Sequence, residues 1–372
     1  MTRGGRFSFG IAAEDLRSLS PRRICLIKPS ALGDIVQTLP LLPVLRAAFP
    51  RAEVTWVINR ELRGLVDGHP DLAGVIPFHR RGTARDWLTL FGSLARSRFD
   101  LVLDLQGLLR TAVMTAVTGA PIRVGLQTAR EGAHLTVNCT IPDTTRQVPA
   151  HARNWRLAEV LGLGDHPRQT IIATSADDDA WASQQLGGLP RPLLAFHPGA
   201  RWETKRWPVE RFAAVAARAM QSWGAGVVIL GSPAERPDAE LLQQQIAGLV
   251  PRGLVRNLTG SSTLKQLSAL LSRVDVAVSN DSGPMHLAAG LGTPTLGIFT
   301  CTSAVQSGPP GPAHELVSTT VDCAASYRKT CPHHGARKHC CHAELDVERV
   351  WRGLQRLIER NALAPFRSTR AA

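Results

Sequence analysis

The sequence predicts an α/β protein composed of two successive domains, each built around a doubly wound parallel sheet. Short apolar runs alternate with longer amphipathic helical patterns along nearly the whole chain, which is typical of repeated strand-helix units. The chain has 372 residues, more than a single hydrophobic core usually serves. The pattern also restarts after a stretch rich in Asp, Gly and Pro, from Gly162 to Pro192, which suits a linker.

Each half of the chain contributes five predicted strands, with helical segments between them. Doubly wound sheets bind ligands at the carboxyl ends of their strands, so we expect a ligand cleft lined by both sheets. The expected strands are Ile24–Ile27, Val54–Ile58, Gly74–Phe78, Leu101–Leu105 and Ile122–Val124 in the first half, and Leu193–Phe196, Val227–Leu230, Leu254–Arg256, Val276–Ser279 and Thr295–Phe299 in the second.

Domain boundaries follow from these strands. A Cys- and His-rich segment closes the second domain, and an amphipathic helix near Val347 to Ile358 ends the chain. The linker holds Asp177–Asp179, which follows no strand end and more plausibly begins a helix than binds a metal. The predicted divisions are an N-terminal extension (1–20), a first domain (21–170), the linker (171–190), a second domain (191–344) with its Cys/His segment (323–342), and the final helix (345–362).

The charge of the chain favours an anionic partner. It carries 43 Lys and Arg against 30 Asp and Glu, a net charge of +13. Such a balance attracts nucleic acid, an acidic membrane surface or phosphorylated substrates. The arginines are scattered rather than clustered, and only one Tyr and ten Phe are available to stack on bases. A solvated basic surface is therefore favoured over a nucleic-acid groove.

The sequence contains no pattern for secretion or for crossing a membrane. The first 20 residues carry Glu14 and Asp15, and no apolar segment of a signal peptide follows them. The longest uncharged run, His286 to His314, is broken by Gly and Pro. We expect a cytoplasmic protein whose positive charge holds it peripherally against the inner face of the cytoplasmic membrane.

Two motifs place charged residues in loops that follow strands. In Lys28–Pro40 a turn with Gly33 leads into a helix at about Asp34, and from spacing alone Asp34 caps that helix. In His197–Phe212 the loop before Pro208 carries Lys205, a cation able to reach phosphate oxygens, although a lone loop lysine is usually just solvated.

Two further motifs follow strands of the second half. Glu235 in Gly231–Asp238 could accept hydrogen bonds from a ribose or complement a helix dipole. In Ser279–Pro294 the small residues and the free N–H groups of a helix start suit a pyrophosphate. Asp281 would repel phosphate, so it caps the helix, orients Lys205 or His286, or accepts sugar hydroxyls.

Taken together, these motifs resemble glycosyltransferase family 9, the heptosyltransferases that build the inner core of lipopolysaccharide. The resemblance spans nearly the whole chain, and it implies a GT-B fold of two facing Rossmann-like domains, the first for the acceptor and the second for the nucleotide sugar. It implies inverting transfer of heptose from ADP-heptose to a Kdo- or heptose-containing lipid A core, and a final helix packed back on the first domain. The matching segments are Ser30–Pro40, Pro198–Ala200 with Lys205–Pro208, and Asn280–Ala289.

The same resemblance assigns roles to individual residues. Asp34 would be the base that deprotonates the acceptor hydroxyl, and Lys205 would neutralise the charge that develops on ADP. Ala200 and Arg201 stand where some relatives offer hydroxyls to the phosphates, with Thr204 the nearest hydroxyl, so donor selectivity is open. The expected donor contacts are Asp281, Ser282, Gly283, Pro284, His286, Glu235, Gly199 and Thr204, and the expected acceptor contacts are Ser30, Gly33 and Gln37.

The Cys/His segment is a candidate metal site. Its four cysteines lack the paired C-x-x-C spacing of zinc knuckles, and a cytoplasmic location disfavours stable disulfides. Reduced structural thiols and a structural metal are the two main alternatives, and a disulfide formed after purification is a third. We expect no cofactor to be required for catalysis. The candidate ligands are Cys323, Cys331, Cys340 and Cys341.

Other functions remain alternatives. A transferase of the same family could use another nucleotide sugar or a protein acceptor. A non-catalytic nucleotide-sugar-binding module is a third alternative, which an intact Asp34 and Lys205 disfavour. A nucleic-acid binder is the weakest.

Overall fold

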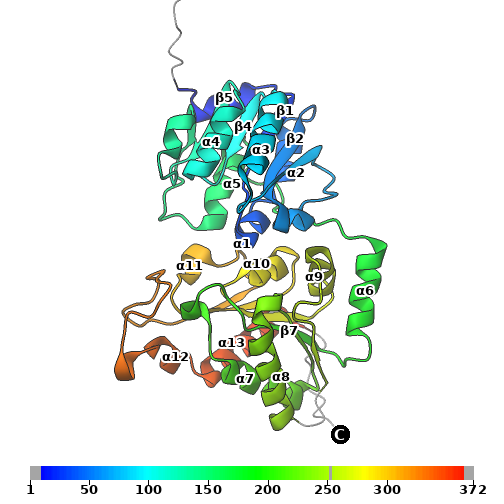
Figure 1. The fold of residues 1–372 in the computed structure, drawn as a ribbon. Coiled ribbons are helices and arrows are strands. Elements are labelled where there is room, and N and C mark those ends of the chain that lie inside the picture. Colours follow the sequence, from blue (N-terminus) through cyan, green and yellow to red (C-terminus); the bar gives the residue numbers. More distant parts are fainter. Residues whose placement is uncertain (1–9, 251–253, 364–372) are drawn as a thin grey trace, which may run out of the picture. The chain divides into compact units, whose positions relative to one another are not determined.

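The computed structural model describes residues 10–250 and 254–363, and the chain divides between Ala173 and Thr174 into two compact units. Each unit contains a six-stranded parallel sheet flanked by helices (Figure 1), which confirms the predicted α/β class. The first sheet consists of β1 (Arg23–Ile27), β2 (Glu53–Asn59), β3 (Gly74–Phe78), β4 (Leu101–Asp104), β5 (Ile122–Leu126) and β6 (Cys139–Ile141). The second consists of β7 (Leu193–His197), β8 (Gly226–Ile229), β9 (Val255–Asn257), β10 (Val276–Asn280), β11 (Thr295–Phe299) and β12 (Glu315–Ser318).

Both sheets have the same strand order. The first runs β3-β2-β1-β4-β5-β6, and the second runs β9-β8-β7-β10-β11-β12, with all pairs parallel. The direction of winding therefore reverses between β1 and β4 in one unit and between β7 and β10 in the other. This reversal is the topological switch point at which doubly wound sheets bind ligands.

Helices connect the strands of both units. Those of the first unit are α1 (Leu32–Val36), α2 (Leu41–Ala48), α3 (Ala84–Arg96), α4 (Leu109–Val117) and α5 (Ala150–Val160), with the 3₁₀ turn η3 (Ala133–Thr136). Those of the second are α6 (Ala176–Leu186), α7 (Val209–Trp223), α8 (Arg236–Leu249), α9 (Leu264–Leu271), α10 (Gly283–Gly290), α11 (Ala304–Ser307), α12 (Cys340–Glu344) and α13 (Val347–Arg360), with η4 (Glu203–Lys205) and η5 (Pro233–Glu235).

The core of the first unit explains why its strands could be read from the sequence. Cys25 and Ile27 of β1 pack with Leu90 and Leu94 of α3 and with Met114 of α4. Ile24 and Leu26, which alternate with them along β1 and point to the other face, are also fully buried, because helices cover that face of the sheet. Strands buried on both faces appear as continuous apolar runs, which is the pattern that predicted them.

Two strands were missed, and each is the edge strand that follows the last predicted strand of its half. β6 has three residues and alternates buried and exposed positions, while β12 is mostly half-buried. Short edge strands bury too little apolar surface to produce a continuous apolar run.

Most of the predicted linker 171–190 is helical, which corrects that boundary. Ser175 caps α6 by accepting a hydrogen bond from the Asp178 N–H at 3.2 Å, and α6 packs against α9 of the second unit. Asp177–Asp179 lies in the first turn of α6, as expected from the sequence. Residues 161–175, between α5 and α6, contain neither helix nor strand and include the division between the units.

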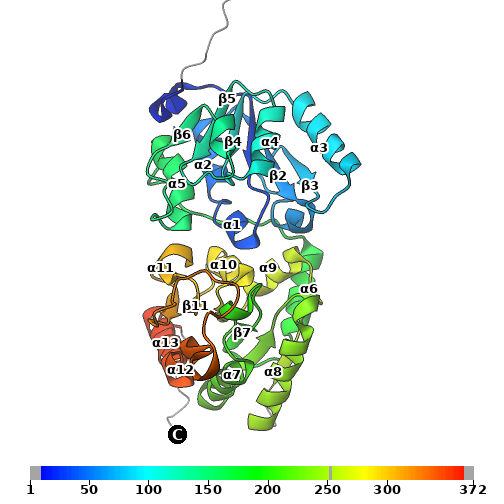
Figure 2. The ribbon, with the colours of Figure 1, turned by 60° about the vertical axis from the view of Figure 1, so that its left-hand side comes forward.

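The final helix packs on the second unit, not on the first as the resemblance implied. Trp351 of α13 stacks on Trp223 of α7, with 4.6 Å between ring centroids, and α13 also lies against β11 and β12 (Figure 2). A Cβ atom at Gly353 would come within 2.6 Å of Val317 Cγ2, so glycine permits the close approach to β12. The buried apolar stripe of α13 completes the core of the second sheet.

Candidate active site

Charged and polar side chains gather at the switch point of each sheet. In the first unit they follow the paired strands β1 and β4, and in the second they follow β7 and β10. The two groups belong to different units.

Asp34 lies in the short helix that follows β1. This helix begins at Leu32 rather than at about Asp34, so Asp34 is its third residue. Its Oδ2 accepts a hydrogen bond from the Ala31 N–H at 2.9 Å, which is a capping contact. Its Oδ1 lies 3.9 Å from Lys28 Nζ, and 43% of the side chain is exposed. Capping therefore occupies one carboxylate oxygen and leaves the other available.

Lys28 directly follows β1 and is almost fully buried. Its Nζ donates a hydrogen bond to the Leu105 carbonyl at 2.8 Å, and its own carbonyl accepts one from the Trp56 indole at 3.1 Å. Trp56 of β2 and Leu105, directly after β4, thus fix the backbone and the side chain of Lys28. A buried ammonium held in this way presents a positive charge to Asp34 at a fixed position.

A pocket of about 230 Å³ opens beside these two residues. Two hydrogen bonds connect Asn154, in the lining of the pocket, to the backbone of Asp34. Asn154 Nδ2 donates to Thr38 Oγ1 at 3.1 Å, and Thr38 Oγ1 donates to the Asp34 carbonyl at 2.7 Å. Asp34 is the one carboxylate of the lining, against four cationic groups, so the pocket attracts an anion. The charged lining residues are Asp34, Lys28, Arg130, Arg146 and Arg153.

The predicted acceptor contacts surround the same turn. Ser30 and Gly33 are half-buried, one just before α1 and the other within it, and the half-buried Gln37 follows its last residue. None of these three lines the pocket, whereas the four cationic residues that do were not predicted. Lys28 opens the Lys28–Pro40 motif but was given no role there, and the three arginines come from segments about 100 residues further along the chain, so no single local motif contains all four.

In the second unit, Lys205 and Asp281 form a close ion pair. Lys205 Nζ lies 2.6 Å from Asp281 Oδ2, which also accepts a hydrogen bond from Thr302 Oγ1 at 2.6 Å. Only 4% of Asp281 is exposed, and His286 Nε2 lies 3.8 Å from its Oδ1. Burial by itself raises the pKa of Asp281, but His286 and Lys205 outweigh it and hold the pKa well below its ordinary value. Of the alternatives left open for Asp281, the geometry favours orienting the two basic neighbours.

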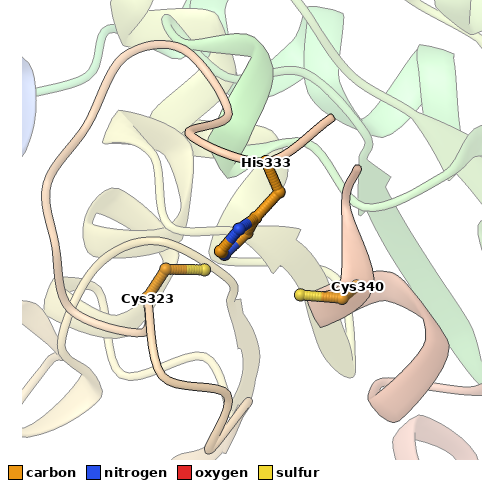
Figure 3. A group of neighbouring side chains, drawn as sticks. All are labelled: Cys323, His333 and Cys340. Atoms are coloured by element: carbon orange, nitrogen blue, oxygen red, sulfur yellow. The ribbon is translucent and has the colours of Figure 1, made fainter. Parts of the chain in front are cut away.

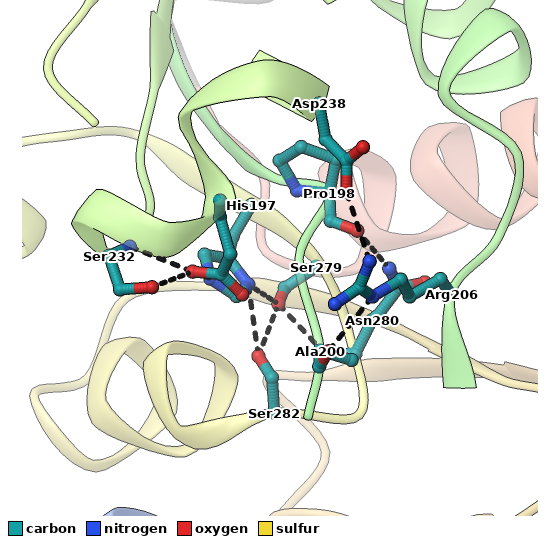
Figure 4. Close-up of polar contacts among 10 residues, drawn as sticks. His197, Pro198, Ala200, Arg206, Ser232, Asp238, Ser279, Asn280 and Ser282 are labelled. Carbon is teal, nitrogen blue, oxygen red and sulfur yellow. Dashed lines mark hydrogen bonds and ion pairs between the residues drawn. The ribbon is translucent and has the colours of Figure 1, made fainter. Parts of the chain in front are cut away.

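Glu235 belongs to a second network on the same edge, which also includes Ser232, His197 and Ser282, all three labelled in Figure 4. Its Oε2 accepts hydrogen bonds from the N–H and hydroxyl of Ser232 at 2.7 and 2.9 Å, and it lies 3.5 Å from His197 Nε2. His197 Nδ1 lies 3.1 Å from the Ser282 hydroxyl. Burial opposes ionisation of Glu235, but His197 and Ser232 stabilise the anion and lower its pKa to about 2.

Two residues shape the loop that carries Lys205. Asn280 donates to the Pro198 carbonyl at 2.6 Å (Figure 4) and accepts from the Trp207 N–H at 3.0 Å. It therefore joins both ends of the loop. A Cβ at Gly199 would lie 1.9 Å from Glu235 Oε1, so only glycine lets the carboxylate reach this position.

The remaining predicted donor residues lie near these networks. Gly283 and Pro284 are the first two residues of α10, and Ser282 is its N-cap. Thr204 is buried and its hydroxyl donates to the Arg328 carbonyl at 2.6 Å. The hydroxyl hydrogen of Thr204 is therefore already engaged in a hydrogen bond within the protein. His197 and Thr302 were missed, although His197 stands directly before the Pro198–Gly199 turn and could have been suspected there.

The Cys/His segment brings three side chains together (Figure 3). Sγ of Cys323, Sγ of Cys340 and a ring nitrogen of His333 lie within 4.8 Å of one another. Cys331 instead accepts a hydrogen bond from the His339 N–H at 3.4 Å, and burial together with nearby thiols raises the pKa of Cys341 to about 12. Within the described residues, the group able to share an ion therefore differs from the four thiols predicted, because the intervening loop folds His333 inward.

Two thiols and an imidazole suit zinc or iron by their chemistry.

No helix within residues 10–250 and 254–363 is both long enough and apolar enough to traverse a bilayer.

Comparison with known proteins identifies the relatives of the chain. Residues 87–336 match the model of the family described as glycosyltransferase family 9 (heptosyltransferase). The chain is 31% identical over 335 residues to the lipopolysaccharide heptosyltransferase 1 of Pseudomonas aeruginosa, a match that covers 83% of this chain and 87% of the relative.

Solved structures have the same fold. The E. coli ADP-heptose LPS heptosyltransferase II superposes with a TM-score of 0.72 at 23% identity, covering 91% of this chain and 99% of that one. TibC, an iron-containing dodecameric glycosyltransferase from enterotoxigenic E. coli, gives a TM-score of 0.54 at 14% identity, covering 91% and 77%. These likenesses confirm the GT-B type of fold that the sequence predicted.

Proposed function

Because the chain belongs to glycosyltransferase family 9, a family of heptosyltransferases, we propose that it transfers heptose from ADP-heptose to an anionic lipid A core acceptor containing Kdo or heptose. The transfer inverts the anomeric carbon and takes place at the inner face of the cytoplasmic membrane. The named activities of relatives support this donor and acceptor, and the chemistry of the two sites agrees with them.

The proposal rests on the position of Asp34, the one carboxylate in the pocket of about 230 Å³ whose other charged lining residues are cations. Asp34 lies beside Lys28 and shares the pocket with three arginines. An acceptor rich in phosphate and carboxylate groups gains from these charges. A neutral protein surface as acceptor gives no reason for such a lining.

In the proposed reaction, Asp34 acts as general base. Its Oδ1 accepts the proton of the acceptor hydroxyl while the hydroxyl oxygen bonds to C1 of the heptose. The bond from C1 to the β-phosphate oxygen breaks, and ADP leaves with the electron pair. Attack from the face opposite to the leaving group inverts C1. The contact from the Ala31 N–H fixes the carboxylate so that one oxygen is directed to the substrate.

Lys205 neutralises the charge that develops on ADP. Asp281 holds the ammonium in place, and a charge fixed in advance requires no reorganisation during the reaction. Ser282, Gly283, Pro284 and His286 would border the diphosphate at the start of α10. Glu235, held by Ser232 and kept ionised, would accept hydrogen bonds from the ribose hydroxyls over Gly199.

A donor panel tests this function. ADP-heptose, ADP-mannose, UDP-glucose and GDP-mannose are each incubated with the enzyme and a Kdo-bearing lipid A acceptor. We expect a product whose mass has grown by one heptose, and thermal stabilisation of the protein, with ADP-heptose above all. Efficient transfer from UDP-glucose or GDP-mannose in its place would refute the donor assignment. ADP-mannose has the same nucleotide as ADP-heptose but a different sugar, so its result separates recognition of the nucleotide from recognition of the sugar.

We further propose that Cys323, His333 and Cys340 hold a structural metal ion. The ion would tie the loop of the Cys/His segment to the start of α12, and no catalytic step depends on it. Iron in TibC supports this proposal. Elemental analysis of protein purified without chelator should find about one equivalent of metal, lost in Cys323→Ser but retained in Cys301→Ser, a buried cysteine outside the triad. Wild-type protein that contains no metal would contradict the proposal and would indicate that the cysteines are simply reduced thiols.

A further inference from the structure

The exposed large apolar side chains of the first unit lie in one neighbourhood. Among the described residues of that unit they are Leu88, Leu109, Val113 and Leu135, with exposures of 70%, 58%, 39% and 79%. All four lie on α3, α4 or η3, and α4 packs against both of the other elements. We call these four residues the apolar face. Soluble proteins seldom gather exposed leucines in this way without an interaction to bury them.

Hydrogen bonds join the parts of this face that are distant in sequence. The Arg130 N–H donates to the Gly107 carbonyl at 3.0 Å, and the Leu109 N–H donates to Glu131 Oε2 at 3.1 Å. The segment that begins α4 is thereby tied to the loop that leads into η3. Leu109 and Leu135 consequently belong to one surface.

Arginines accompany the apolar face. On α3, Arg85, Leu88 and Arg96 share one side of the helix by their spacing. Burial lowers the pKa of Arg110, and the charges of Arg80 and Arg130 add to this effect. Glu131 opposes it, so the three guanidinium groups share one neighbourhood with a single carboxylate.

Acidic groups do not balance this charge. Segments 79–98 and 109–136 contain Arg80, Arg81, Arg85, Arg96, Arg98, Arg110, Arg123 and Arg130, but only Asp86 and Glu131 as acidic residues. Asp86 accepts from the Thr83 N–H at 2.7 Å, and Glu131 accepts from Leu109. The surroundings of the apolar face are therefore strongly positive.

We propose that the apolar face docks the first unit on the surface of an anionic lipid bilayer. Stable attachment to a membrane takes two signals, an apolar group that enters the interface and basic groups that attract acidic headgroups, and this surface offers both. Arg130 lines the Asp34 pocket and also belongs to this surface, so docking would hold the pocket at the level of the headgroups. The choice of a lipid partner rests on the proposed function, because an amphiphilic acceptor resides in that layer.

Vesicle co-sedimentation of the full chain tests the proposal. The vesicles consist of phosphatidylcholine alone or of phosphatidylcholine with phosphatidylglycerol. The test variant is Leu109→Asp with Leu135→Asp. The control variant is Leu241→Asp with Leu249→Asp, two leucines of α8 in the other unit with comparable exposure. Unchanged thermal unfolding shows that each variant is folded.

We expect wild type and control to bind the anionic vesicles, and the test variant to lose at least about tenfold in partition coefficient. Failure of the wild type to bind, or equal loss in test and control variants, overturns the proposal. So does concentration-dependent self-association that the test variant abolishes, because the face would then be an interface between two copies of the chain.

A second readout separates this proposal from the proposed function. Transfer is measured with a water-soluble acceptor fragment that lacks acyl chains. The test variant should match the wild type on this substrate and fall behind on acceptor embedded in vesicles. Loss of transfer on both substrates would show that the leucines serve the pocket itself and would overturn the docking role. A wild type that binds vesicles but transfers no heptose would refute the function and leave the docking face standing.

Discussion

Asp34 performs two tasks with the two oxygens of one carboxylate. Oδ2 satisfies the backbone at the start of α1, and Oδ1 faces Lys28 and the pocket. Spacing alone favoured capping and the family resemblance favoured catalysis, and the geometry accommodates both. A capping contact is therefore no argument against a catalytic role, because it also orients the side chain.

Lys205 should matter for both binding and rate. Its replacement in Lys205→Ala removes the cation proposed to neutralise the diphosphate, and it leaves Asp281 as a buried carboxylate without its closest ion-pair partner. We expect weaker donor binding and a fall in kcat of about 100-fold or more. Calorimetric titration with ADP and steady-state kinetics measure these two effects. Lys265→Ala, in α9 of the same unit, serves as control, and an unchanged donor dissociation constant in Lys205→Ala would contradict the phosphate role.

Glu235 should make stability depend on pH. Its pKa is about 2 in the folded protein against an ordinary value of 4.5, so the folded state is favoured above pH 4.5 and that contribution disappears as the pH falls toward 2. Allowing for solvent screening, Glu235→Gln should lower the free energy of unfolding by about 1–2 kcal/mol at pH 7. Urea unfolding at a series of pH values measures the difference. A deficit that stays constant down to pH 3 would show that the shifted ionisation is not its source.

The sequence located charged loop residues but not their long-range partners. Lys205, Asp281 and Glu235 could be identified because each follows a strand within a short motif. His197 and Thr302 acquire their importance from hydrogen bonds to residues more than 20 positions away. A single sequence contains no signal for such contacts until the strand order is known.

At the level of elements, burial decided which parts were predictable. All ten predicted strands exist, and most of them are central strands whose burial on both faces produces uninterrupted apolar runs, while the predicted β3 and β9 are half-buried edge strands. The edge strands β6 and β12 were missed, since β6 has only three residues and β12 is mostly half-buried, whereas the start of α6 at Asp177–Asp179 was expected from the sequence. The position of α13 is set by tertiary packing. The family resemblance implied that this helix packs on the first domain, and that prediction was wrong.

Trp351 should be the residue on which the docking of α13 depends most. It is 2% exposed, stacks on Trp223, and Arg218 lies over its ring at 4.6 Å. Truncation in Trp351→Ala leaves a large cavity between α13 and α7 and should cost about 3–5 kcal/mol. Denaturant unfolding measures this loss. The neighbouring exposed Arg352→Ala should cost less than about 1 kcal/mol, and similar losses in both variants would show that α13 contributes little core.

At the scale of the whole molecule, one strand order occurs twice with different chemistry at its switch points. The first unit places a lone carboxylate among cations, and the second places a lysine and an ionised glutamate beside the start of a helix. The first arrangement suits an anionic acceptor and the second suits a sugar nucleotide. The repeated topology was predictable from the alternating pattern, while this division of labour required the side chains.

The central claim is that Asp34 removes the acceptor proton in transfer from ADP-heptose. It is tested most directly by product mass spectrometry with wild type, Asp34→Asn and Asp34→Ala at saturating donor, with ADP-heptose binding measured in parallel. Asn can still accept the Ala31 N–H but cannot take a proton. The account predicts a fall in turnover of about 1,000-fold or more in both variants, with donor affinity within about twofold of wild type. Turnover in Asp34→Asn within about tenfold of wild type would contradict it.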